Sequence, residues 1–297
     1  MRIPSWITQH IAALRALLVL TVILGIVYPL VLTGVAQIPG LRSKADGSLV
    51  KVGDSTVGSS LIGQSFTDAK GNPLVQYFQS RPSDAGDGYD PTATSASNLG
   101  PESVVDTLPD PSVKGDTGTQ ALLSQVCSRS LAVGRLEGVS GARPYCTADG
   151  LGAVLVVVRA GGVPGGNVTA VYSVNQACPA TPFLSTYDGV AVQCAKFGTD
   201  YTALGTVTPI RGSAPARPAV PSDAVTASGS GLDPDISVAY AHLQAPRVAR
   251  ERNTTVANVD SLIDTYTTGR ALGFMGDPAV NVLQLNMALD RRYPYRP

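Results

Sequence analysis

The sequence is poor in the side chains that most metal and acid–base sites use. Its 297 residues include two histidines, His10 and His242, and one tryptophan. Lys and Arg balance Asp and Glu at 22 each, so there is no basic excess to attract nucleic acid. Charged residues make up 15% of the chain, whereas Gly (31) and Pro (22) are frequent. This composition predicts a loop-rich domain without a metal site and disfavours a long coiled coil.

Charged side chains are missing altogether from residues 16–36, which form one apolar run. About twenty helical residues span the roughly 30 Å core of a bilayer, so we predict a transmembrane helix at 16–38. Residues 1–15 would precede it in the cytoplasm. Pro29 lies inside the run and predicts a kink, which a neighbouring helix would tolerate. The alternative is a secretory signal cleaved after residues 34–36, although signal runs are shorter, at roughly 7–15 residues. Flanking positive charges are nearly even and do not decide the orientation.

All four cysteines lie in one region after the apolar run, at Cys127, Cys146, Cys178 and Cys194. Their even number and the lack of a C-x-x-C motif predict two disulfides, and therefore a domain outside the cytoplasm. Three pairings are open. We favour neighbours in sequence, Cys127 with Cys146 and Cys178 with Cys194, because each bond closes a loop worth about 3 kcal/mol. Four buried free thiols are the alternative.

Patterns after the apolar run predict an α+β fold. Residues 47–66 indicate short strands broken by glycine turns, and residues 119–136 have helical spacing. Residues 153–158 form a buried-strand run, and residues 168–174 alternate as a half-buried strand does. With a third strand at 190–192, these patterns predict a small β-rich module that contains the cysteines.

The pattern of the last part of the chain predicts helices. Asp233 fits an N-cap and Pro234 the first helical position of one helix, with a kink at Pro246. Thr254 or Thr255 would cap a second helix with Val256, Val259, Leu262, Ile263 and Tyr266 facing inward, and Gly273 and Gly276 would end it. Residues 280–289 are apolar, but their period leaves strand and helix open.

Two strings suggest catalysis at first sight. Residues 116–118 read Asp-Thr-Gly, but the string lacks the lysine of a P-type ATPase phosphorylation loop and the preceding strand of an aspartic protease. We interpret it as a polar linker. A Ser-His-Asp hydrolase would have to use His242, which lies on a predicted helix without a Gly-x-Ser-x-Gly elbow nearby. We interpret His242 as a surface histidine.

A third string, residues 226–234, is rich in glycine and serine and precedes a predicted helix. Such a loop can bind an anion at the helix N-terminus. However, it has no P-loop lysine, and Asp233 and Asp235 would compete with phosphate for the same backbone donors. We favour a tight turn that caps itself.

Several strings, in order along the chain, resemble the C subunit of Kdp-type potassium-transporting ATPases. They are Tyr28-Pro29 and residues 61–64, 77–83, 97–101, 225–234, 247–249, 269–273 and 280–290. Within them, the residues that match the family motifs are Arg81, Pro82, Asn98, Gly100, Ser228, Gly229, Ser230, Gly231, Asp233, Arg247, Arg270, Asn281 and Asn286. The resemblance covers about 14–101 and 221–290 and leaves an enlarged middle region.

We predict a single transmembrane helix in the cell membrane, followed by an α/β domain that the disulfides make extracytoplasmic. Residues 39–108 and 218–297 would form its core, and residues 109–217 a β-rich, cysteine-containing insertion. The resemblance implies a membrane hetero-oligomer with a channel-like potassium-translocating subunit and a P-type ATP-hydrolysing subunit. The chain would be a non-catalytic subunit that aids assembly and activity in the lipid bilayer.

The family is also described as a catalytic chaperone that raises the ATP affinity of the pump subunit, and Gln64 matches the glutamine proposed to touch nucleotide. ATP would then bind through the partner subunit, with no cofactor held tightly by this chain. Disulfides conflict with direct contact, because they place the domain across the membrane from ATP. Two other functions are open: an anchored extracytoplasmic hydrolase using Asp116, Ser228 or His242, and an envelope-binding module in the insertion.

Overall fold

The computed structural model describes residues 4–95, 99–163 and 165–296. Two compact units divide the chain, Met1–Leu61 and Ile62–Pro297. The first contains the apolar helix and a small hairpin. The second is a mixed α+β body, which confirms the predicted fold class.

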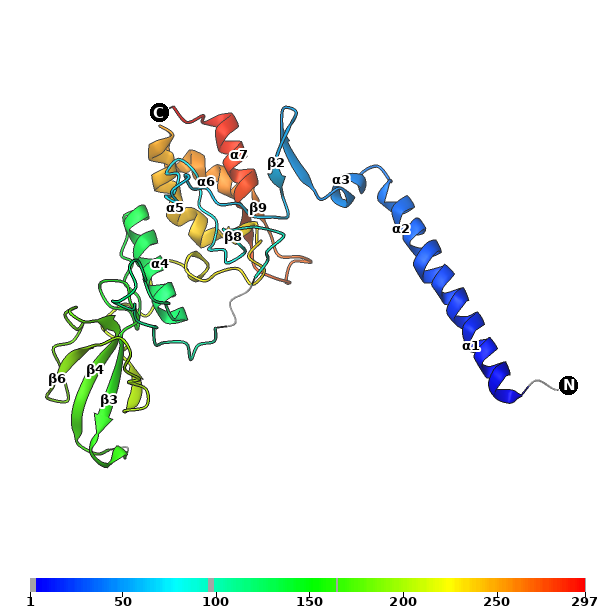
Figure 1. The fold of residues 1–297 in the computed structure, drawn as a ribbon. Coiled ribbons are helices and arrows are strands. Elements are labelled where there is room, and N and C mark those ends of the chain that lie inside the picture. The colour runs from blue at the N-terminus through cyan, green and yellow to red at the C-terminus, as the bar shows by residue number, and fades with distance from the viewer. Residues whose placement is uncertain (1–3, 96–98, 164, 297) are drawn as a thin grey trace. The chain divides into compact units, whose positions relative to one another are not determined.

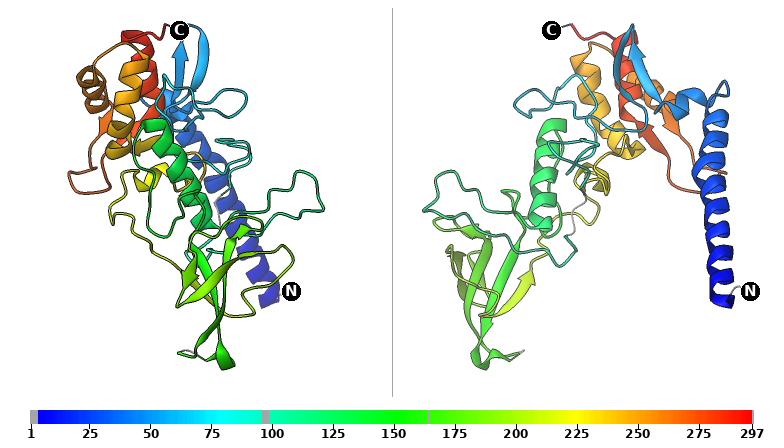
Figure 2. Two further views of the ribbon diagram at one scale, coloured as in Figure 1. Left: turned by 90° about the vertical axis from the view of Figure 1, so that its left-hand side faces the viewer. Right: turned by 45° about the vertical axis from the view of Figure 1, so that its right-hand side comes forward.

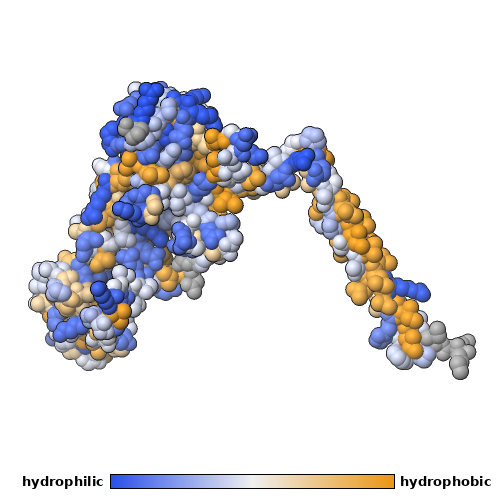
Figure 3. All heavy atoms as spheres, turned by 45° about the horizontal axis from the view of Figure 1, so that its top comes forward, coloured by the Kyte–Doolittle hydropathy of each residue, from blue (hydrophilic) through white to orange (hydrophobic). Residues whose placement is uncertain are grey.

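The apolar helix of the first unit is longer than predicted. Helix α1 (Ser5–Val22) continues through a π-helical turn (Ile23–Val27) into α2 (Tyr28–Ala36), as Figure 1 shows. Pro29 has no N–H and crowds the carbonyl four residues earlier, so one wider turn before it absorbs the mismatch. The 32-residue segment has a mean hydropathy of 2.5, and the visible face is largely apolar in Figure 3. It is long and apolar enough to cross a membrane.

Short elements complete the first unit. Helix α3 (Arg42–Ala45) precedes an antiparallel hairpin of β1 (Leu49–Val52) and β2 (Ser55–Ser59). Gly53, with a φ of 59°, makes the turn between them. These are the short strands with a glycine turn that the sequence predicted.

Three helices and a small sheet form the C-terminal part of the second unit. They are α5 (Val238–Glu251), α6 (Val256–Thr265) and α7 (Val282–Arg292), with the sheet order β8 (Asp235–Ser237), β10 (Ala279–Asn281), β9 (Thr267–Thr268). Their core includes Tyr240, Leu262, Ile263, Leu285 and Leu289, together with Phe78 from the earlier segment. This core brings residues 78 and 289 into one apolar cluster.

A separate five-stranded sheet forms the middle of the chain. Its strand order is β5 (Thr186–Tyr187), β6 (Val190–Ala195), β4 (Val168–Ala177), β3 (Val154–Arg159), β7 (Thr206–Pro209), and only the β4–β6 pair is parallel. Short 3₁₀ turns occur at Ala160–Gly162 and Ser222–Ala224. Residues 154 and 156 pack on one face of β3, and residues 155 and 157 on the other. Both faces are covered, which explains the unbroken apolar run.

Helix α4 (Leu122–Glu137) connects the sheet with the helical part (Figure 2). The Ser124 hydroxyl accepts a hydrogen bond from Gly152 N–H beside the sheet, and Val126 and Val133 pack against the helical core. Disulfides join Cys127 with Cys146 and Cys178 with Cys194, the pairing that the sequence analysis favoured. One bond therefore fastens α4 to the segment that leads into the sheet.

Two predicted helix boundaries were wrong, the start of α5 and the end of α6. Residues 235–237 form β8, and α5 begins at Val238 with Ser237 as its N-cap, so Asp233 and Pro234 do not start the helix. Strand pairing with β10 holds these residues extended. Thr255 does cap α6, but α6 ends at Thr265, well before Gly273 and Gly276.

The structure corrects one side-chain placement and decides one assignment that was left open. On α6, Val259, Leu262 and Ile263 are buried, whereas Val256 at the first turn is exposed. The apolar stretch 280–289 contains both elements that its period left open, the end of β10 followed by α7.

Candidate functional site

Arg81 links the extended segment before residue 82 to the glycine-rich turn at residues 226–233. Its Nη1 atom lies 2.9 Å from Asp233 Oδ2. Its Nη2 atom donates to the carbonyls of Thr226 and Ala227, each at 3.3 Å. The guanidinium group therefore contacts both the start and the end of the turn.

The turn caps itself, as we interpreted it. Ser228 Oγ accepts hydrogen bonds from Gly231 N–H at 2.9 Å and Asp233 N–H at 3.4 Å, and Ser230 Oγ accepts from Leu232 N–H at 3.1 Å. These are the backbone donors that a phosphate would need. With serine hydroxyls bound to them, the turn is a structural corner that leads into a strand.

A buried tyrosine packs beside this corner. The Tyr89 hydroxyl donates to the Arg81 carbonyl, and burial raises the pKa of Tyr89 to about 12, so the phenol stays protonated at neutral pH. Gly63 N–H donates to Leu232 O at 2.8 Å, and a Cβ on Gly63 would lie 2.3 Å from the Tyr89 ring. Only glycine fits this approach.

Gln64 follows Gly63 directly. Its carbonyl accepts a hydrogen bond from the Ser80 hydroxyl at 2.8 Å. The main chain of Gln64 is therefore attached to the residue that precedes Arg81. This places Gln64 next to the glycine-rich turn, in the same part of the fold.

Side chains also hold the segment 75–79, which pairs with no β-strand in the part of the chain that the structure describes. Buried groups donate to each of its five carbonyls: Arg247 to Val75 and Tyr77 (3.0 Å), Arg252 to Gln76 (2.7 Å), Asn286 to Phe78 (3.0 Å) and Gln244 to Gln79 (3.1 Å). The same Asn286 and Gln244 amides accept from the N–H groups of Phe78 and Gln79. Helices α5 and α7 thus replace a neighbouring strand and deliver Arg81 to the turn.

Arg247 has a second partner in this arrangement. Its Nε atom lies 3.0 Å from a Glu137 carboxylate oxygen, and both side chains are almost fully buried. The pair connects the end of α4 to the middle of α5. Gln244, Arg252 and Glu137 are not singled out in the sequence analysis, although polar residues at apolar-face positions of a helix are a usable signal.

Other motif residues lie apart from this cluster. Arg270 pairs with Asp277 at 2.8 Å on an exposed hairpin, and Asn281 caps α7 and donates to Asp235 at 3.1 Å. Gly100 accepts a turn hydrogen bond from Ser103 N–H at 2.9 Å. Asn98 lies outside the described residues.

The chain matches a known family on both sides of its middle region. The family model described as "K+-transporting ATPase, c chain", KdpC, matches residues 10–107 and 198–291. The chain belongs to the KdpC family. The matched segments include Arg81, the glycine-rich turn and the side chains that hold residues 75–79.

Individual KdpC relatives match over almost their whole length. The protein named Potassium-transporting ATPase KdpC subunit from Mycobacterium tuberculosis H37Rv is 37% identical over 283 residues, 95% of this chain and 98% of the relative. The KdpC subunit of Beijerinckia indica is 36% identical over 287 residues, 96% and 95% of the two chains. That of Streptomyces coelicolor is 37% identical over 288 residues, 94% and 90%. The enlarged middle is therefore shared with these KdpC subunits.

The candidate catalytic residues of this KdpC chain do not come together. Asp116 accepts from Asp110 N–H at 2.6 Å and Gly118 N–H at 3.0 Å, and these donors lower the pKa of its carboxyl group. His242 lies exposed, with Nδ1 2.9 Å from Asp260. No hydrogen bond recorded among the described residues joins Asp116, His242 and Ser228. Asp116 thus stabilises a loop, as a polar linker residue does.

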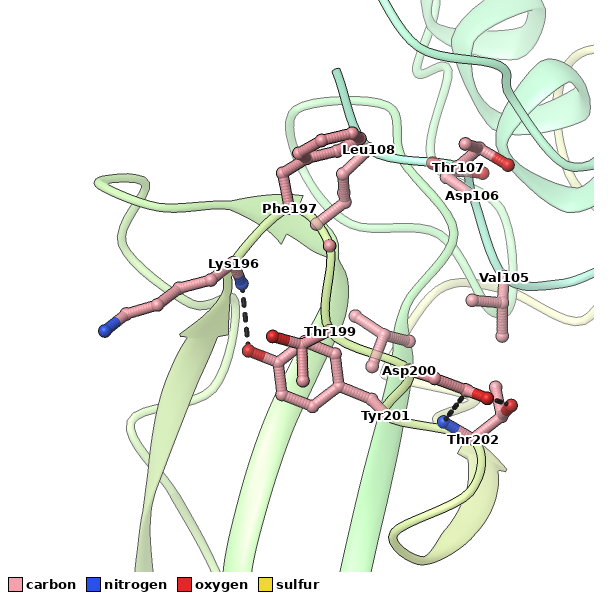
Figure 4. Close-up of a pocket in the computed structure, with 12 residues that line it drawn as sticks. Val105, Asp106, Thr107, Leu108, Lys196, Phe197, Thr199, Asp200, Tyr201 and Thr202 are labelled. Carbon is pink, nitrogen blue, oxygen red and sulfur yellow. Dashed lines mark hydrogen bonds between the residues drawn. The ribbon is translucent and has the colours of Figure 1, made fainter. Parts of the chain in front are cut away.

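A cleft of about 390 Å³ lies between residues 105–108 and the loop 196–202 (Figure 4). Asp106 on its wall is tied to the start of α4, accepting from Ala121 N–H and the Ser124 hydroxyl, each at 2.8 Å, and burial raises its pKa. Tyr201 accepts from Lys196 N–H at 2.9 Å, and the Lys196 side chain extends away from the cleft. Asp106 and Tyr201 thus accept hydrogen bonds from the chain itself and stabilise the fold. Among the described residues there is no cluster of three His, Cys, Asp or Glu for a metal.

Proposed function

We propose that this KdpC chain is a non-catalytic subunit of an ATP-driven potassium-uptake complex and acts by contact with a channel-like subunit and a P-type ATPase subunit. The observation that carries the proposal is the family match on both sides of the insertion, at residues 10–107 and 198–291. Two features support it. The apolar segment Ser5–Ala36 can anchor the chain in a bilayer, and buried polar side chains bind the fold's own backbone.

Co-purification tests this proposal directly. A tagged full-length chain, solubilised from native membranes in mild detergent, is expected to carry the ATP-hydrolysing and potassium-translocating subunits with it. A tagged single-pass membrane protein of unrelated sequence serves as the control. Recovery of the chain alone, under conditions in which the other two subunits stay together, would contradict the proposal.

We further propose that the second unit lies outside the cytoplasm. Two disulfides support this placement, because the cytosol keeps thiols reduced. The exposed loop around Asp110 offers a site for a protease. Protease added to intact, wall-stripped cells should cut there, and protease confined to the cytosolic side should not. The reverse pattern would place the domain in the cytosol.

The extracytoplasmic placement also bears on the nucleotide contact that the family resemblance suggests for Gln64. An extracytoplasmic Gln64 cannot touch cytosolic ATP, so any effect on ATP affinity would pass through the partner subunits. We predict that Gln64→Ala leaves the half-saturating ATP concentration of the whole complex within twofold of the parent. Gln193→Ala, at an exposed position of β6, is the matched control. A tenfold rise for Gln64→Ala alone would favour direct nucleotide contact.

A further inference from the structure

The hairpin between β9 and β10 carries an apolar tip. Ala271 and Met275 exchange two backbone hydrogen bonds of 2.9 Å, which close a tight turn. Leu272, Phe274 and Met275 are 84%, 71% and 53% exposed, among the most exposed large apolar residues outside the membrane helix. The turn is thus ordered by its own backbone while its apolar side chains face water.

Leu272 adopts a conformation that leucine rarely takes. Its φ is 53°, in the left-handed region that glycine or asparagine enters at much lower cost. Neighbouring Gly273, with a φ of 81°, already supplies a residue suited to such a turn. Backbone strain that presents an exposed leucine indicates that the side chain itself is used.

Charge around the tip distinguishes a protein partner from a lipid surface. Arg270 and Asp277 form a 2.8 Å ion pair at the base of the turn, so residues 269–278 carry no net charge. Segments that bind anionic membranes combine apolar residues with an excess of Lys and Arg, and aromatic belts at membrane interfaces are rich in Trp and Tyr. Residues 269–278 have no excess of Lys and Arg and no Trp or Tyr. An apolar centre bordered by a paired charge is instead the arrangement of a protein-interface hot spot.

We propose that this tip, Leu272, Phe274 and Met275, docks into an uncharged apolar pocket on another subunit of the pump. The inference rests on the proposed function, because it requires partner subunits. The two charges at the base would stay paired at the rim and exclude water from the apolar centre.

Photo-crosslinking tests the position of the tip. A benzophenone amino acid at Phe274, in the full chain within native membranes, should crosslink to another subunit of the complex. The same group at Phe197, an exposed phenylalanine on the sheet module, is the control. A crosslink from position 274 to lipid, to a second copy of this chain, or to nothing would overturn the inference.

Dissociation of the detergent-solubilised complex tests the energetics. Leu272→Ser with Phe274→Ser should speed loss of the chain from the complex at least tenfold, and the matched pair Phe197→Ser with Leu204→Ser should not. Because all four side chains are exposed, the unfolding midpoint of the isolated chain should be unchanged. If the parent chain co-purifies and the tip variant dissociates equally slowly, the tip inference fails alone. If the parent chain does not co-purify, the proposed function fails as well.

Discussion

Single buried polar residues hold together segments that are far apart in the sequence. Arg247, Gln244 and Asn286 bind the backbone of residues 75–79 across separations of 165 residues or more. Arg247 and Asn286 match motifs of the family, yet all three side chains contact this chain's own backbone. The residue pattern could indicate the family, but not which side chains serve the fold.

Arg247 is the residue whose loss should cost most. Arg247→Met would leave the Glu137 carboxylate buried without its cation, remove the side-chain donor to the Val75 carbonyl, and leave the Tyr77 carbonyl with only the Gln79 amide as a side-chain donor. We expect a loss of about 3–5 kcal/mol in the free energy of unfolding, measured by denaturant titration of the full chain in detergent. Arg250→Met, whose side chain is 70% exposed, should cost less than about 1 kcal/mol. Equal losses for the two variants would show that burial of the pair is unimportant.

The glycine-rich turn makes a prediction of its own. Gly231 has a φ of 72°, and a Cβ there would lie 2.5 Å from that of Ala85. Gly231→Ala should destabilise the chain by more than about 1 kcal/mol in the same titration. Gly229→Ala is the control, since it has open space and no left-handed φ. An unchanged free energy of unfolding for Gly231→Ala would show that the turn can accommodate a Cβ at this position.

At the scale of elements, α4 depends on a cap that comes from a distant part of the sequence. Asp106, fifteen residues before Ala121 in the chain, accepts from Ala121 N–H and the Ser124 hydroxyl. The helix itself was predictable from its apolar spacing. Its cap was not, because a carboxylate that far upstream reaches the helix only after the chain has folded back.

Asp106 also gives the fold a pH dependence. Burial raises the pKa of its carboxyl group, so the folded state holds the proton more tightly than the unfolded state does. Its contribution to stability should be largest below about pH 4, near the ordinary value for Asp, and decline as pH rises through the folded pKa. Asp106→Asn should remove this slope from unfolding measured between pH 3 and 7, and Asp87→Asn, on an exposed loop, should not. Parallel pH curves for the parent and Asp106→Asn would contradict the assignment.

At the scale of the whole molecule, the chain combines a membrane-type helix with a body whose middle region contains a five-stranded sheet and two disulfides. The family match skips residues 108–197, whereas the relatives align across nearly the whole chain. The sheet module is thus common to a group of KdpC subunits. Its edge strand β7 comes from the matched segment 198–291, so the sheet joins matched and unmatched parts of the chain.

The membrane helix is testable at its centre. Leu24→Asp should cost roughly 2.5–3.5 kcal/mol of insertion free energy, read as a lower membrane-inserted fraction in a translocation assay. Leu24→Val keeps the apolar surface and should insert like the parent. Normal insertion and assembly of Leu24→Asp would instead indicate that this position faces a polar protein interior.

The sequence by itself determined the features that depend on residues close to one another in the chain. It identified the apolar segment, the strands β3 and β4, helix α4 and the favoured cysteine pairs, because period, length and loop closure act between near neighbours. The family resemblance likewise came from strings read in order.

Tertiary structure alone decided where long-range pairing overrides local preference. Asp233-Pro234 is a good helix start by local rules, but residues 235–237 pair with β10, some forty residues later, and α5 begins at Val238. The hydrogen bonds to residues 75–79 and the outward tip at Leu272 are equally invisible in a local window. The strand pairing of residues 235–237 and the hydrogen bonds to residues 75–79 have one physical reason: a buried backbone group must find a donor or acceptor, and the folded chain supplies it from whatever segment lies nearest in space.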